Sequence, residues 1–359
     1  MISEWFPGKL GLQQRVLPAY RAVFLDMLAG SCDGGMSVFS GQPLANEQIE
    51  TVGHLDVAEM IQTRNRHLFN PSSPLYYCWQ EDILRWLEHS QPDVLIVEAN
   101  PRYPKTRSAM EWMHRRKRPV LGWGLGAPKI SGFFSGWRKR VRHRFLCYLD
   151  GVIAYSHKGA AEYISMGIPT EKVFVAPNAV AKKPGYTQSV RPDAYLGQPK
   201  ILFVGRLQAR KRVDNLVAAC SMLPNQLAAH LFIIGDGPVR SELEMQAANV
   251  FPSAEFTGAL HGEELVKIFK SADLFVLPGT GGLALQEAMG FGLPVIAAEG
   301  DGTQDDLVRS ENGIRVPAND IHALSQAIET ALSNPTRLRQ MGAESLRIVV
   351  EEVNVERMV

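Results

Sequence analysis

Short apolar runs alternate with amphipathic stretches along nearly the whole chain. The runs have the length of buried β-strands, whereas the stretches between them space their apolar residues three and four positions apart, as helices do. Strands that alternate with helices indicate a parallel sheet with right-handed crossovers. We expect strands over Leu10–Val16, Ser37–Phe39, Asp93–Glu98, Pro119–Trp123, Gly151–Tyr155, Val173–Ala176, Lys200–Val204, Ala229–Ile234, Ala254–Thr257, Leu274–Leu277, Val295–Ala297 and Gly313–Val316. We expect helices over Tyr20–Leu28, Asp82–His89, Lys105–Arg116, Lys158–Met166, Val213–Met222, Pro238–Ala248, Leu283–Met289, Ile321–Leu332 and Leu338–Val353.

The pattern is interrupted once, between two halves of similar length. Residues 181–199 are polar and rich in proline and glycine, which is typical of an inter-domain linker. We therefore predict an α/β protein with two Rossmann-like doubly wound domains, 1–180 and 200–345, that face each other across a cleft at the carboxyl ends of their strands. Residues 346–359 form a C-terminal helix that either stays on the second domain or returns to the first.

Composition adds few constraints. The chain has 359 residues, of which 45% are hydrophobic and 21% charged, as in an ordinary globular protein. Its four cysteines are far apart and lack metal-ligand spacing, so we expect reduced core thiols. No apolar run approaches the roughly 20 residues that span a bilayer, and the N-terminus has no signal-peptide pattern. We expect a cytoplasmic protein, or one that is peripheral at the inner face of the plasma membrane.

Positive charge is concentrated in the first half. Thirteen Lys and Arg residues and one acidic residue, Glu111, lie between Asn100 and Arg144. This excess indicates an anionic partner for the first domain, such as a phospholipid, a polyprenyl phosphate or a phosphorylated glycan. Part of the basic segment also has an apolar stripe at helical spacing, formed by Phe134, Trp137, Val141, Phe145 and Tyr148. The stripe either packs on the sheet of the first domain, or contacts an anionic membrane through 133–148, or recognises the acceptor.

The clearest chemical signal lies between Ser271 and Ala297. Pro278 ends a buried strand, and a glycine loop with Gly279, Gly281 and Gly282 follows it directly. A helix then begins, so its free N–H groups and the positive end of its dipole point at the loop, which predicts an anionic ligand. Glu287 lies one turn into this helix, where it is placed to bind the hydroxyls of a ribose.

Two cations follow another buried strand of the second domain. Arg206 comes directly after Gly205, and Lys211 comes five residues later, in a loop at the carboxyl end of the strand. Ligands of open α/β sheets bind at this end, where arginine offers a planar fork and lysine a point charge to phosphate oxygens. Together with the glycine loop, these cations predict a phosphate site.

Two further glycine patterns resemble a dinucleotide fingerprint without completing it. Gly235 and Gly237 form a turn after a strand, but Arg240 stands where the third glycine is required. Gly122, Gly124 and Gly126 have the spacing, but Pro128 interrupts the helix start. We interpret both as tight loops lining the cleft, and not as the site of a dehydrogenase.

The chain offers little support for metal chemistry. It contains no Asp-x-Asp, no HExxH and no clustered His or Cys, so we expect neither a metal nor a cofactor. Most histidines are interpreted as surface or packing residues. His157 is the exception, because it follows a strand end.

The blocks FVGRLQARKRVDNLVAA, FIIGDGP, FTGAL and ADLFVLPGTGGLALQEAMGFGLPVIA, with Asn312-Gly313 after them, are specific in this order. They resemble the bacterial-type retaining glycosyltransferases of family 4, the glycosyl transferases group 1, which have the GT-B fold. The resemblance covers about 200–345. It is weaker over 1–180, where VLPAYR, WGLG and AYSHKGAAEYISMGIPTEKVFVAPNAV are similar to a bacterial subgroup.

This resemblance implies roles for individual residues. The catalytic pair would be Arg206 and Lys211, which hold the nucleotide diphosphate and stabilise its charge as the glycosidic bond breaks. A nucleotide-diphosphate sugar would be the donor substrate, and the transfer would retain configuration without a metal. The implied donor-binding residues are Gly205, Gly235, Gly237, Gly279, Gly281, Gly282, Leu283, Ala284 and Glu287. The acceptor-side candidates are Arg15, Tyr20, Arg21, Gly124 and His157.

One departure from the family pattern concerns the transferred sugar. The family usually has a glutamate eight residues before the position of Glu287, and this chain has Gly279 there. An aromatic residue often follows two positions later, where this chain has Gly281. Three explanations stay open: the sugar presents different hydroxyls, another group contacts it, or transfer activity is reduced.

Three functions compete on these grounds. The first is an enzyme that moves a hexose-type sugar from a nucleotide donor to a glycan or lipid-linked acceptor. The second is a non-catalytic nucleotide-sugar-binding or scaffold protein, which Gly279 motivates. The third is a sugar-nucleotide epimerase, which the lack of evident acid and base carboxylates disfavours. Nothing in the basic cluster indicates a nucleic-acid-binding module.

Overall fold

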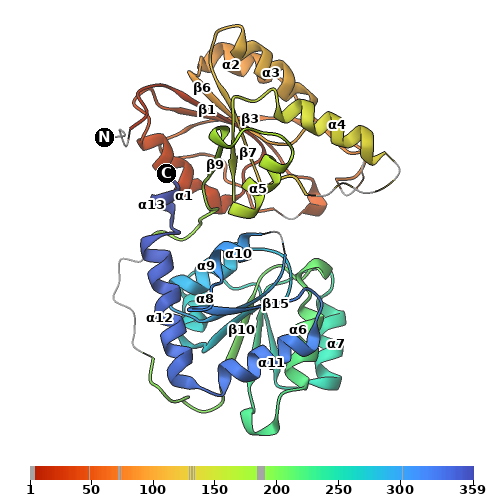
Figure 1. Cartoon of the computed structure of the whole chain (residues 1–359), viewed down its shortest axis with the longest axis vertical. Helices are drawn as coiled ribbons and strands as arrows, with labels where there is room; N and C mark the ends of the chain where they lie inside the picture. The colour runs from red at the N-terminus through yellow and green to blue at the C-terminus, as the bar shows by residue number, and fades with distance from the viewer. Residues whose placement is uncertain are drawn as a thin grey trace. The chain divides into compact units, whose positions relative to one another are not determined.

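The computed structural model describes residues 5–47, 49–71, 73, 75–128, 130, 132, 134–183, 191–300 and 302–359. The chain forms two compact units, one of Met1–Pro177 with Met358–Val359 and one of Asn178–Arg357. Each unit is built on a parallel sheet that helices cover (Figure 1). Part of the predicted linker, residues 184–190, lies outside the described residues.

The first unit contains a seven-stranded sheet in the order β3-β2-β1-β6-β7-β8-β9. Every neighbouring pair in it is parallel. The strand order reverses between β1 and β6, so the connections leave these two strands toward opposite faces. The strands are β1 (Leu10–Val16), β2 (Met36–Gly41), β3 (Glu59–Thr63), β6 (Val94–Glu98), β7 (Val120–Gly124), β8 (Gly151–Ala154) and β9 (Val173–Val175). A separate antiparallel pair joins β4 (Asn65–Leu68) to β5 (Tyr77–Gln80).

The helices of the first unit leave a well-packed core between themselves and the sheet. They are α1 (Ala22–Gly30), α2 (Ile83–Ser90), α3 (Pro104–His114), α4 (Ser135–Leu146) and α5 (His157–Ser165), with 3-10 turns η1 (Ala19–Arg21), η2 (Ala45–Glu47) and η3 (Thr170–Lys172). Trp86 of α2 stacks on Phe39 of β2 at 5.0 Å, and its indole N–H donates to Ser37 Oγ at 2.8 Å. The buried indole thus keeps a hydrogen-bond partner while it anchors α2 to the sheet.

The second unit contains a six-stranded parallel sheet in the order β12-β11-β10-β13-β14-β15. Its strands are β10 (Lys200–Val204), β11 (His230–Ile234), β12 (Ala254–Gly258), β13 (Leu274–Leu277), β14 (Val295–Ala298) and β15 (Gly313–Val316). The central strands are continuous apolar runs because helices cover both of their faces. The order reverses between β10 and β13, as in a dinucleotide-binding sheet.

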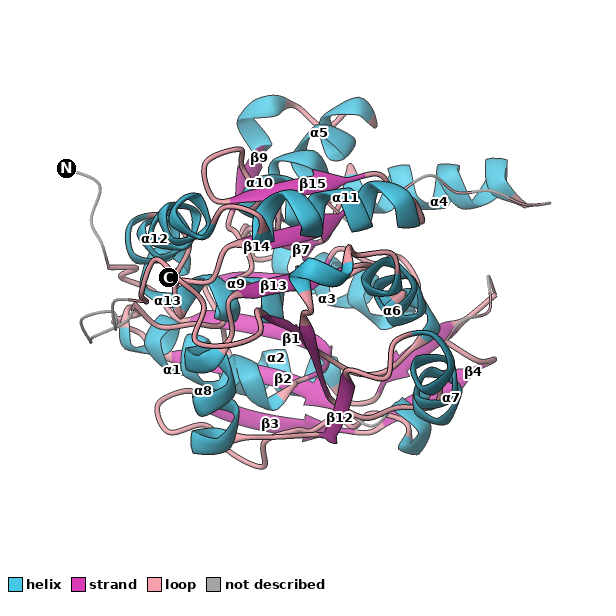
Figure 2. Cartoon of the chain, turned by 90° about the horizontal axis from the view of Figure 1, so that it is seen from below, coloured by secondary structure: helices cyan, strands magenta, loops and turns pink. Residues whose placement is uncertain are grey.

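The helices of the second unit divide between the two faces of the sheet. They are α6 (Val213–Ser221), α7 (Arg240–Val250), α8 (Gly262–Ser271), α9 (Leu283–Gly290), α10 (Thr303–Leu307), α11 (Ile321–Leu332), α12 (Pro335–Glu351) and α13 (Val355–Met358), with 3-10 turns η4 (Ala209–Lys211) and η5 (Asn225–Leu227). Figures 1 and 2 show α6, α7 and α11 on one side and α8, α9 and α12 on the other. The helix α9, which follows the glycine loop, packs against α12 and β13.

Every strand expected from the sequence pattern is present, with its ends shifted by two residues at most. The pattern missed β3, β4 and β5 as strands and α8 and α10 as helices. The sequences of β3 and β4 are largely polar, and their residues are only partly buried, so the apolar signal of a strand is weak there.

Two local predictions are wrong. Gly122 and Trp123 lie within β7, as the predicted strand Pro119–Trp123 requires, and Gly124 ends it, so the interpretation of Gly122, Gly124 and Gly126 as one tight loop is wrong; the chain turns only at Gly126, where φ is +125°. Cys147 is exposed, whereas the prediction placed all four thiols in the core. The other three cysteines are buried, and all four are free.

The apolar stripe of α4 is not packed on the sheet, which contradicts the first of its three interpretations. Leu146 is the buried residue among those described in α4. Phe134 is 58% exposed and Trp137 is 52% exposed, and only the far end of the stripe, at Phe145, touches the core. Phe133, which belongs to the predicted contact segment 133–148, lies outside the described residues. The first turns of α4 therefore leave their aromatic side chains in solvent.

Among the described residues, no helix combines the length and the apolar character needed to cross a bilayer. The same residues contain no group of three or more His, Cys, Asp or Glu placed to hold a metal ion.

Candidate functional site

The two loops that the sequence singled out in the second unit, the cation loop and the glycine loop, meet at the switch point of its sheet, where the strand order reverses. Arg206 and Lys211 follow β10, the glycine loop follows β13, and these two strands are neighbours. The loops are also bonded to each other: the Thr280 N–H donates to the Arg210 carbonyl at 3.2 Å, and Arg210 Nη1 donates to Thr280 Oγ1 at 3.1 Å. A crevice at the carboxyl ends of strands that diverge in this way is where open α/β sheets bind ligands.

Gly279 lies against the backbone of the cation loop. A Cβ atom added at Gly279 would stand 2.5 Å from the Arg210 carbonyl oxygen and 2.6 Å from the carbonyl carbon and oxygen of Lys211. Real Cβ atoms do not approach backbone so closely, and the backbone here cannot rotate away as a side chain would. The glycine is therefore required for the two loops to meet.

Lys211 directs its charge at the glycine loop. Gly281 has φ +123°, and a Cβ added there would fall on the Lys211 ammonium nitrogen. Gly282 is the N-cap of α9 and has no side chain with which to cap the first N–H groups. Leu283 and Ala284, the first residues of the helix, are partly exposed. An ammonium group and the open end of a helix thus stand side by side, and both favour an anion.

Arg206 occupies the turn between β10 and the second glycine pattern. The N–H of Gly205 donates to the Ile234 carbonyl at 2.9 Å, and the N–H of Leu207 donates to the Asp236 carbonyl at 2.8 Å. Gly235 and Gly237 lie in the same bonded segment, since the Gly235 N–H donates to the Gly258 carbonyl at 2.8 Å. Main-chain bonds on both sides therefore fix the half-buried Arg206 at this edge of the sheet.

Glu287 lies in α9, one turn beyond the glycine loop. It is half-buried, and burial raises the pKa of its carboxyl group. Among the described residues, no cation or N–H offsets this effect on the pKa. A carboxylate that is dehydrated and not matched by a cation is suited to accept hydrogen bonds from a ligand.

Sequence reasoning missed Gln304, which holds the glycine loop from behind. Gln304 of α10 is 0% exposed, and its Nε2 donates to the Gly281 carbonyl at 3.2 Å and to the Gly279 carbonyl at 3.4 Å. Its Oε1 is buried and has no hydrogen-bond partner within the part of the chain that the structure describes. The loop after β14 lies at the same edge of the sheet as the two predicted loops, so the strand order was the signal that could have pointed to it.

Arg15, an acceptor-side candidate of the first unit, is already engaged in an ion pair. Its guanidinium donates to both carboxylate oxygens of Glu47, at 2.8 and 2.9 Å, and its N–H donates to Glu98 Oε1 at 2.5 Å. Burial alone would raise the pKa of Glu47, but Arg15 and the N–H of Leu44 lower it. The charge of Arg15 is thus balanced within the unit.

The other acceptor-side candidates gather near the carboxyl ends of β7 and β8. The Arg21 guanidinium lies 4.5 Å from the centre of the Trp123 ring, and its Nη2 donates to the Tyr155 hydroxyl at 2.8 Å. Tyr20 and His157 are exposed, with His157 as the first residue of α5, and Gly124 ends β7. The structure brings Arg21, Gly124 and His157 to the carboxyl edge of the sheet, the edge at which β1 also ends, beside Arg15.

Comparison with known proteins finds a family match within the second unit. Residues 187–347 match the family model of the glycosyl transferases group 1. A GDP-mannose-dependent alpha-mannosyltransferase of Mycobacterium tuberculosis is 38% identical over 136 residues, which are 37% of this chain and 34% of that protein. A GDP-mannose-dependent alpha-(1-6)-phosphatidylinositol monomannoside mannosyltransferase of Mycolicibacterium smegmatis is 28% identical over 203 residues, 53% of this chain and 51% of that protein. The chain thus spans between a third and a half of the length of these curated relatives.

Solved structures match the chain over nearly its full length. Anabaena HepE in complex with UDP has a TM-score of 0.72 at 18% identity, covering 98% of this chain and 96% of that chain. The fold is that of the GT-B glycosyltransferases. Sucrose-phosphate synthase from Thermosynechococcus elongatus matches with a TM-score of 0.69 at 20% identity, again over 98% and 96% of the two chains. Each of the two sheets described above forms, with the helices that cover it, one Rossmann-like domain of the GT-B fold. The predicted fold class is therefore confirmed.

Proposed function

We propose that the chain is a glycosyltransferase that moves a hexose-type sugar from a nucleotide diphosphate to a glycan or lipid-linked acceptor. The observation that carries the proposal is that the loop of Arg206 and Lys211 meets the glycine loop at the switch point of the second sheet, with the Lys211 ammonium against Gly281. A cation beside the open N-terminus of a helix stabilises a diphosphate leaving group. The glycosyl transferases group 1 match spans the same segments and supports the assignment.

In the proposed reaction, the bond between the anomeric carbon of the sugar and the diphosphate oxygen breaks. Negative charge accumulates on the diphosphate, where Arg206 and Lys211 neutralise it together with the N–H groups of Leu283 and Ala284. These groups supply the positive charge that a divalent cation supplies in other transferases, which is the basis for proposing metal independence. Retention of the anomeric configuration rests on the family resemblance.

Transfer itself is the experiment for this proposal. The purified chain is incubated with a panel of nucleotide sugars and with lipid-linked and glycan acceptors, and glycosylated product and released nucleoside diphosphate are quantified. GDP-mannose and UDP-glucose enter the panel first, because relatives use GDP-mannose and HepE has been solved with UDP-glucose. We expect product and diphosphate in equal amounts with one donor. Nucleotide binding without transfer or hydrolysis across the panel would identify a non-catalytic binding protein, and conversion of a donor without acceptor an epimerase.

Glu287→Gln is expected to weaken nucleotide binding about tenfold, because a carboxylate accepts hydrogen bonds from two ribose hydroxyls and an amide oxygen accepts fewer.

The same change, Glu287→Gln, should raise the melting temperature at pH 7.5 but not at pH 4. Burial raises the pKa of Glu287 above its ordinary value of 4.5, so its contribution to stability is present below that value and is lost as the pH rises through the folded-state pKa. Calorimetry and thermal melts at both pH values test this, with the exposed Glu263→Gln as the control. Unchanged nucleotide affinity would contradict the ribose role.

Gln304→Leu is expected to lower nucleotide affinity about tenfold and to change stability little. The substitution removes the Gln304 amide nitrogen, whose hydrogen bonds to the Gly279 and Gly281 carbonyls hold the loop in position. It also removes the buried amide oxygen of Gln304, which has no described partner. Gln286→Leu is the matched control. The Gln286 amide oxygen accepts from the Val180 N–H and its nitrogen donates to the Val353 carbonyl, both at 2.7 Å, so its loss should lower the melting temperature. Calorimetry in which Gln304→Leu binds nucleotide as tightly as the wild type would refute the positioning role.

A further inference from the structure

The first sheet has a switch point of its own, between β1 (Leu10–Val16) and β6 (Val94–Glu98). The strand order reverses there, as it does at the candidate nucleotide site of the second sheet. Open α/β sheets bind ligands in the crevice at such a point, outside the carboxyl ends of the strands. The loop after β6, residues 99–103, is therefore a place where the first unit should bind a ligand, and none of the acceptor-side candidates comes from it.

Arg102 is the cation of this loop, and its position is fixed. Its N–H and its Nε both donate to Asn100 Oδ1 at 3.2 Å, and its carbonyl accepts from the Cys78 N–H at 3.0 Å. Its guanidinium lies 5.6 Å from the centre of the ring of Tyr76, a buried residue. The contacts with an amide oxygen and a ring hold the side chain in place, so the two terminal nitrogens of the guanidinium are preorganised for a ligand.

The carboxylates at this switch point are committed to other groups. Glu98, the last residue of β6, accepts from the Arg15 N–H at 2.5 Å, and Glu47 pairs with the Arg15 guanidinium. Across the part of the chain that the structure describes, no carboxylate forms an ion pair with Arg102. Arg102 is thus a half-buried cation without a matching charge, and a bound anion would stabilise it.

The helix α3 (Pro104–His114) begins directly after the loop, so its N-terminus lies at the same edge of the sheet. Its first turn contains Lys105 and no acidic residue, and no side chain caps it. Thr106, in the same turn, is 1% exposed, and its hydroxyl lacks a hydrogen-bond partner among the described residues. A lysine beside the positive end of a helix dipole is unfavourable. An anion bound at this end would offset both charges.

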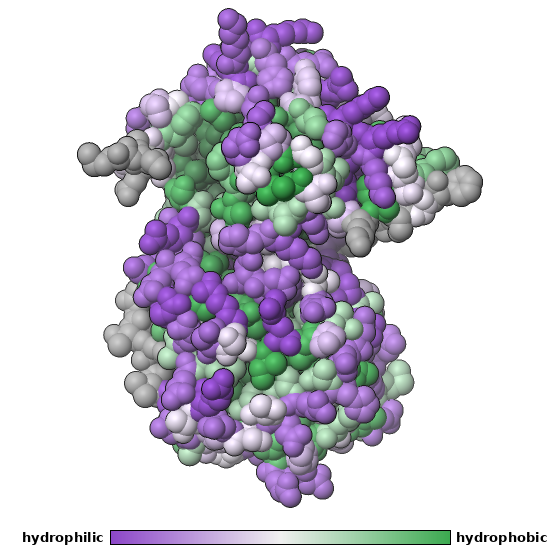
Figure 3. Space-filling view, in the orientation of Figure 1, coloured by the Kyte–Doolittle hydropathy of each residue, from purple (hydrophilic) through white to green (hydrophobic). Residues whose placement is uncertain are grey.

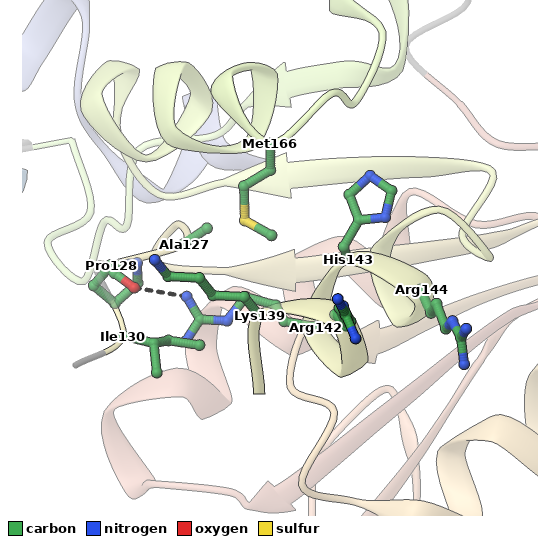
Figure 4. A pocket seen from close by; sticks show the side chains of 9 residues that line it. Ala127, Pro128, Ile130, Lys139, Arg142, His143, Arg144 and Met166 are labelled. Atoms are coloured by element: carbon green, nitrogen blue, oxygen red, sulfur yellow. Dashed lines mark hydrogen bonds between the residues drawn. The ribbon is translucent and has the colours of Figure 1, made fainter. Parts of the chain in front are cut away.

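Further positive charge lies near the loop. Burial lowers the pKa of Arg142, and the nearby Arg138 and Arg102 lower it as well, so the field of Arg102 reaches α4. Arg142 Nη1 donates to the Pro128 carbonyl at 2.7 Å, and Arg142 lines a pocket of about 440 Å³ there (Figure 4). Figure 3 shows hydrophilic side chains gathered over α3 and α4. An anion that approaches Arg102 therefore meets a positive potential wider than the loop itself.

We propose that Arg102, Lys105 and the N-terminus of α3 bind a phosphate group of the acceptor. The guanidinium supplies paired N–H donors to phosphate oxygens, the ammonium supplies a point charge, and the helix supplies the positive end of its dipole. The acceptor is then a glycan phosphate or a lipid phosphate, since both present the same group. Calling this ligand the acceptor rests on the proposed function, whereas phosphate binding itself is measured without a donor.

The test is ligand-observed NMR with three probes: glucose 1-phosphate, the soluble lipid dihexanoyl phosphatidic acid, and glucose. The full chain with Lys211→Ala serves as the parent, because this change disables the proposed phosphate site of the second unit. We expect at least one of the two phosphates to bind and glucose not to bind. Arg102→Ala should weaken phosphate binding about tenfold or more, the effect of losing one hydrogen-bonded charge pair. Stronger binding of glucose 1-phosphate identifies a glycan phosphate, and stronger binding of the lipid identifies a lipid phosphate.

Lys105→Glu separates a loss of the site from a loss of the fold. It should weaken phosphate binding about tenfold or more, because repulsion replaces attraction. It should also keep or raise the melting temperature, because an acidic residue is favourable in the first turn of a helix. Arg107→Ala is the matched control, since Arg107 lies in the same helix and pairs with Glu111 at 3.2 Å, and it should bind phosphate as the parent does.

Absence of binding by both phosphates would overturn the proposal, as would equal binding of glucose and glucose 1-phosphate. Parent-like binding by both Arg102→Ala and Lys105→Glu would overturn it as well. Phosphate binding that depends on Arg102, in a wild-type chain that transfers no sugar, would refute the proposed function and leave this site in place. Transfer to an acceptor without phosphate, at equal rates in Arg102→Ala and the wild type, would overturn the acceptor role alone.

Discussion

Lys211→Ala is expected to lower the rate of sugar transfer by about a hundredfold or more while the protein stays folded. The ammonium group lies against Gly281, at the place where the leaving diphosphate would gather charge. Removing one preorganised charge-stabilising donor from a site of this kind reduces the rate by about 10² to 10³. Because part of this charge is already present on the bound donor and more develops as the bond breaks, both KM and kcat should worsen.

Steady-state kinetics and a thermal melt of the same preparation test this expectation. Arg210→Ala is the matched control, since Arg210 is a cation of the same loop whose guanidinium donates to Thr280 and Gln208. It should lose less than about tenfold, the effect of one exposed hydrogen-bonding side chain. Near-normal turnover of Lys211→Ala, or an equal loss in both variants, would refute the leaving-group role. The same reasoning applies to Arg206→Ala.

Gly279→Glu, which restores the residue usual in the family, is expected to abolish measurable transfer instead of improving it. A Cβ at this position meets the carbonyl oxygen of Arg210 and the carbonyl group of Lys211, so the cation loop must move away. Overpacking of this kind destabilises a protein by about 1 to 3 kcal/mol and here also displaces the Lys211 ammonium. Gly279→Ala should show the same effects in smaller measure.

Transfer assays and chemical denaturation of the two Gly279 variants provide the measurement. Gly136→Ala is the control, because a Cβ at Gly136 meets nothing within 4 Å, and its position inside α4 favours alanine. Wild-type stability together with wild-type or higher transfer in Gly279→Glu would show that the loops adjust, and the close approach would then not explain the departure from the family pattern. The structural result bears on the three explanations for that departure. It favours a different contact to the sugar, because the backbone leaves no room for a side chain at residue 279.

The sheets were predictable because their central strands are buried on both faces. Runs such as Lys200–Val204 and Leu274–Leu277 carry their apolar character continuously, and short glycine-rich turns mark their ends. The site was predictable for a related reason: Arg206, Lys211 and the glycine loop all follow strand ends, and the carboxyl ends of parallel strands share one edge. The strand order that makes them neighbours is a tertiary property, and the alternation of elements only implied it.

The remaining features depend on contacts between residues far apart in the sequence. Nothing local marks Gln304 as the residue that holds the glycine loop, because its two acceptors lie more than twenty positions earlier. Arg15 of β1 pairs with Glu47 of η2, which lies 32 residues later, so nothing local in the sequence marks Arg15 as a cation that already has an ion pair. The stripe of α4 has the spacing of a buried face, and spacing alone does not distinguish a face packed on a sheet from one that meets a membrane.

The central claim is that the glycine loop and its two cations form the nucleotide site, and calorimetric titration with UDP, GDP, dTDP and ADP tests it most directly. The account predicts that the chain binds one of these nucleotides at least about tenfold more tightly than the others, and that Lys211→Ala loses this binding while its melting temperature is unchanged. Absence of binding to all four, or equal binding by the wild type and Lys211→Ala, would contradict the account.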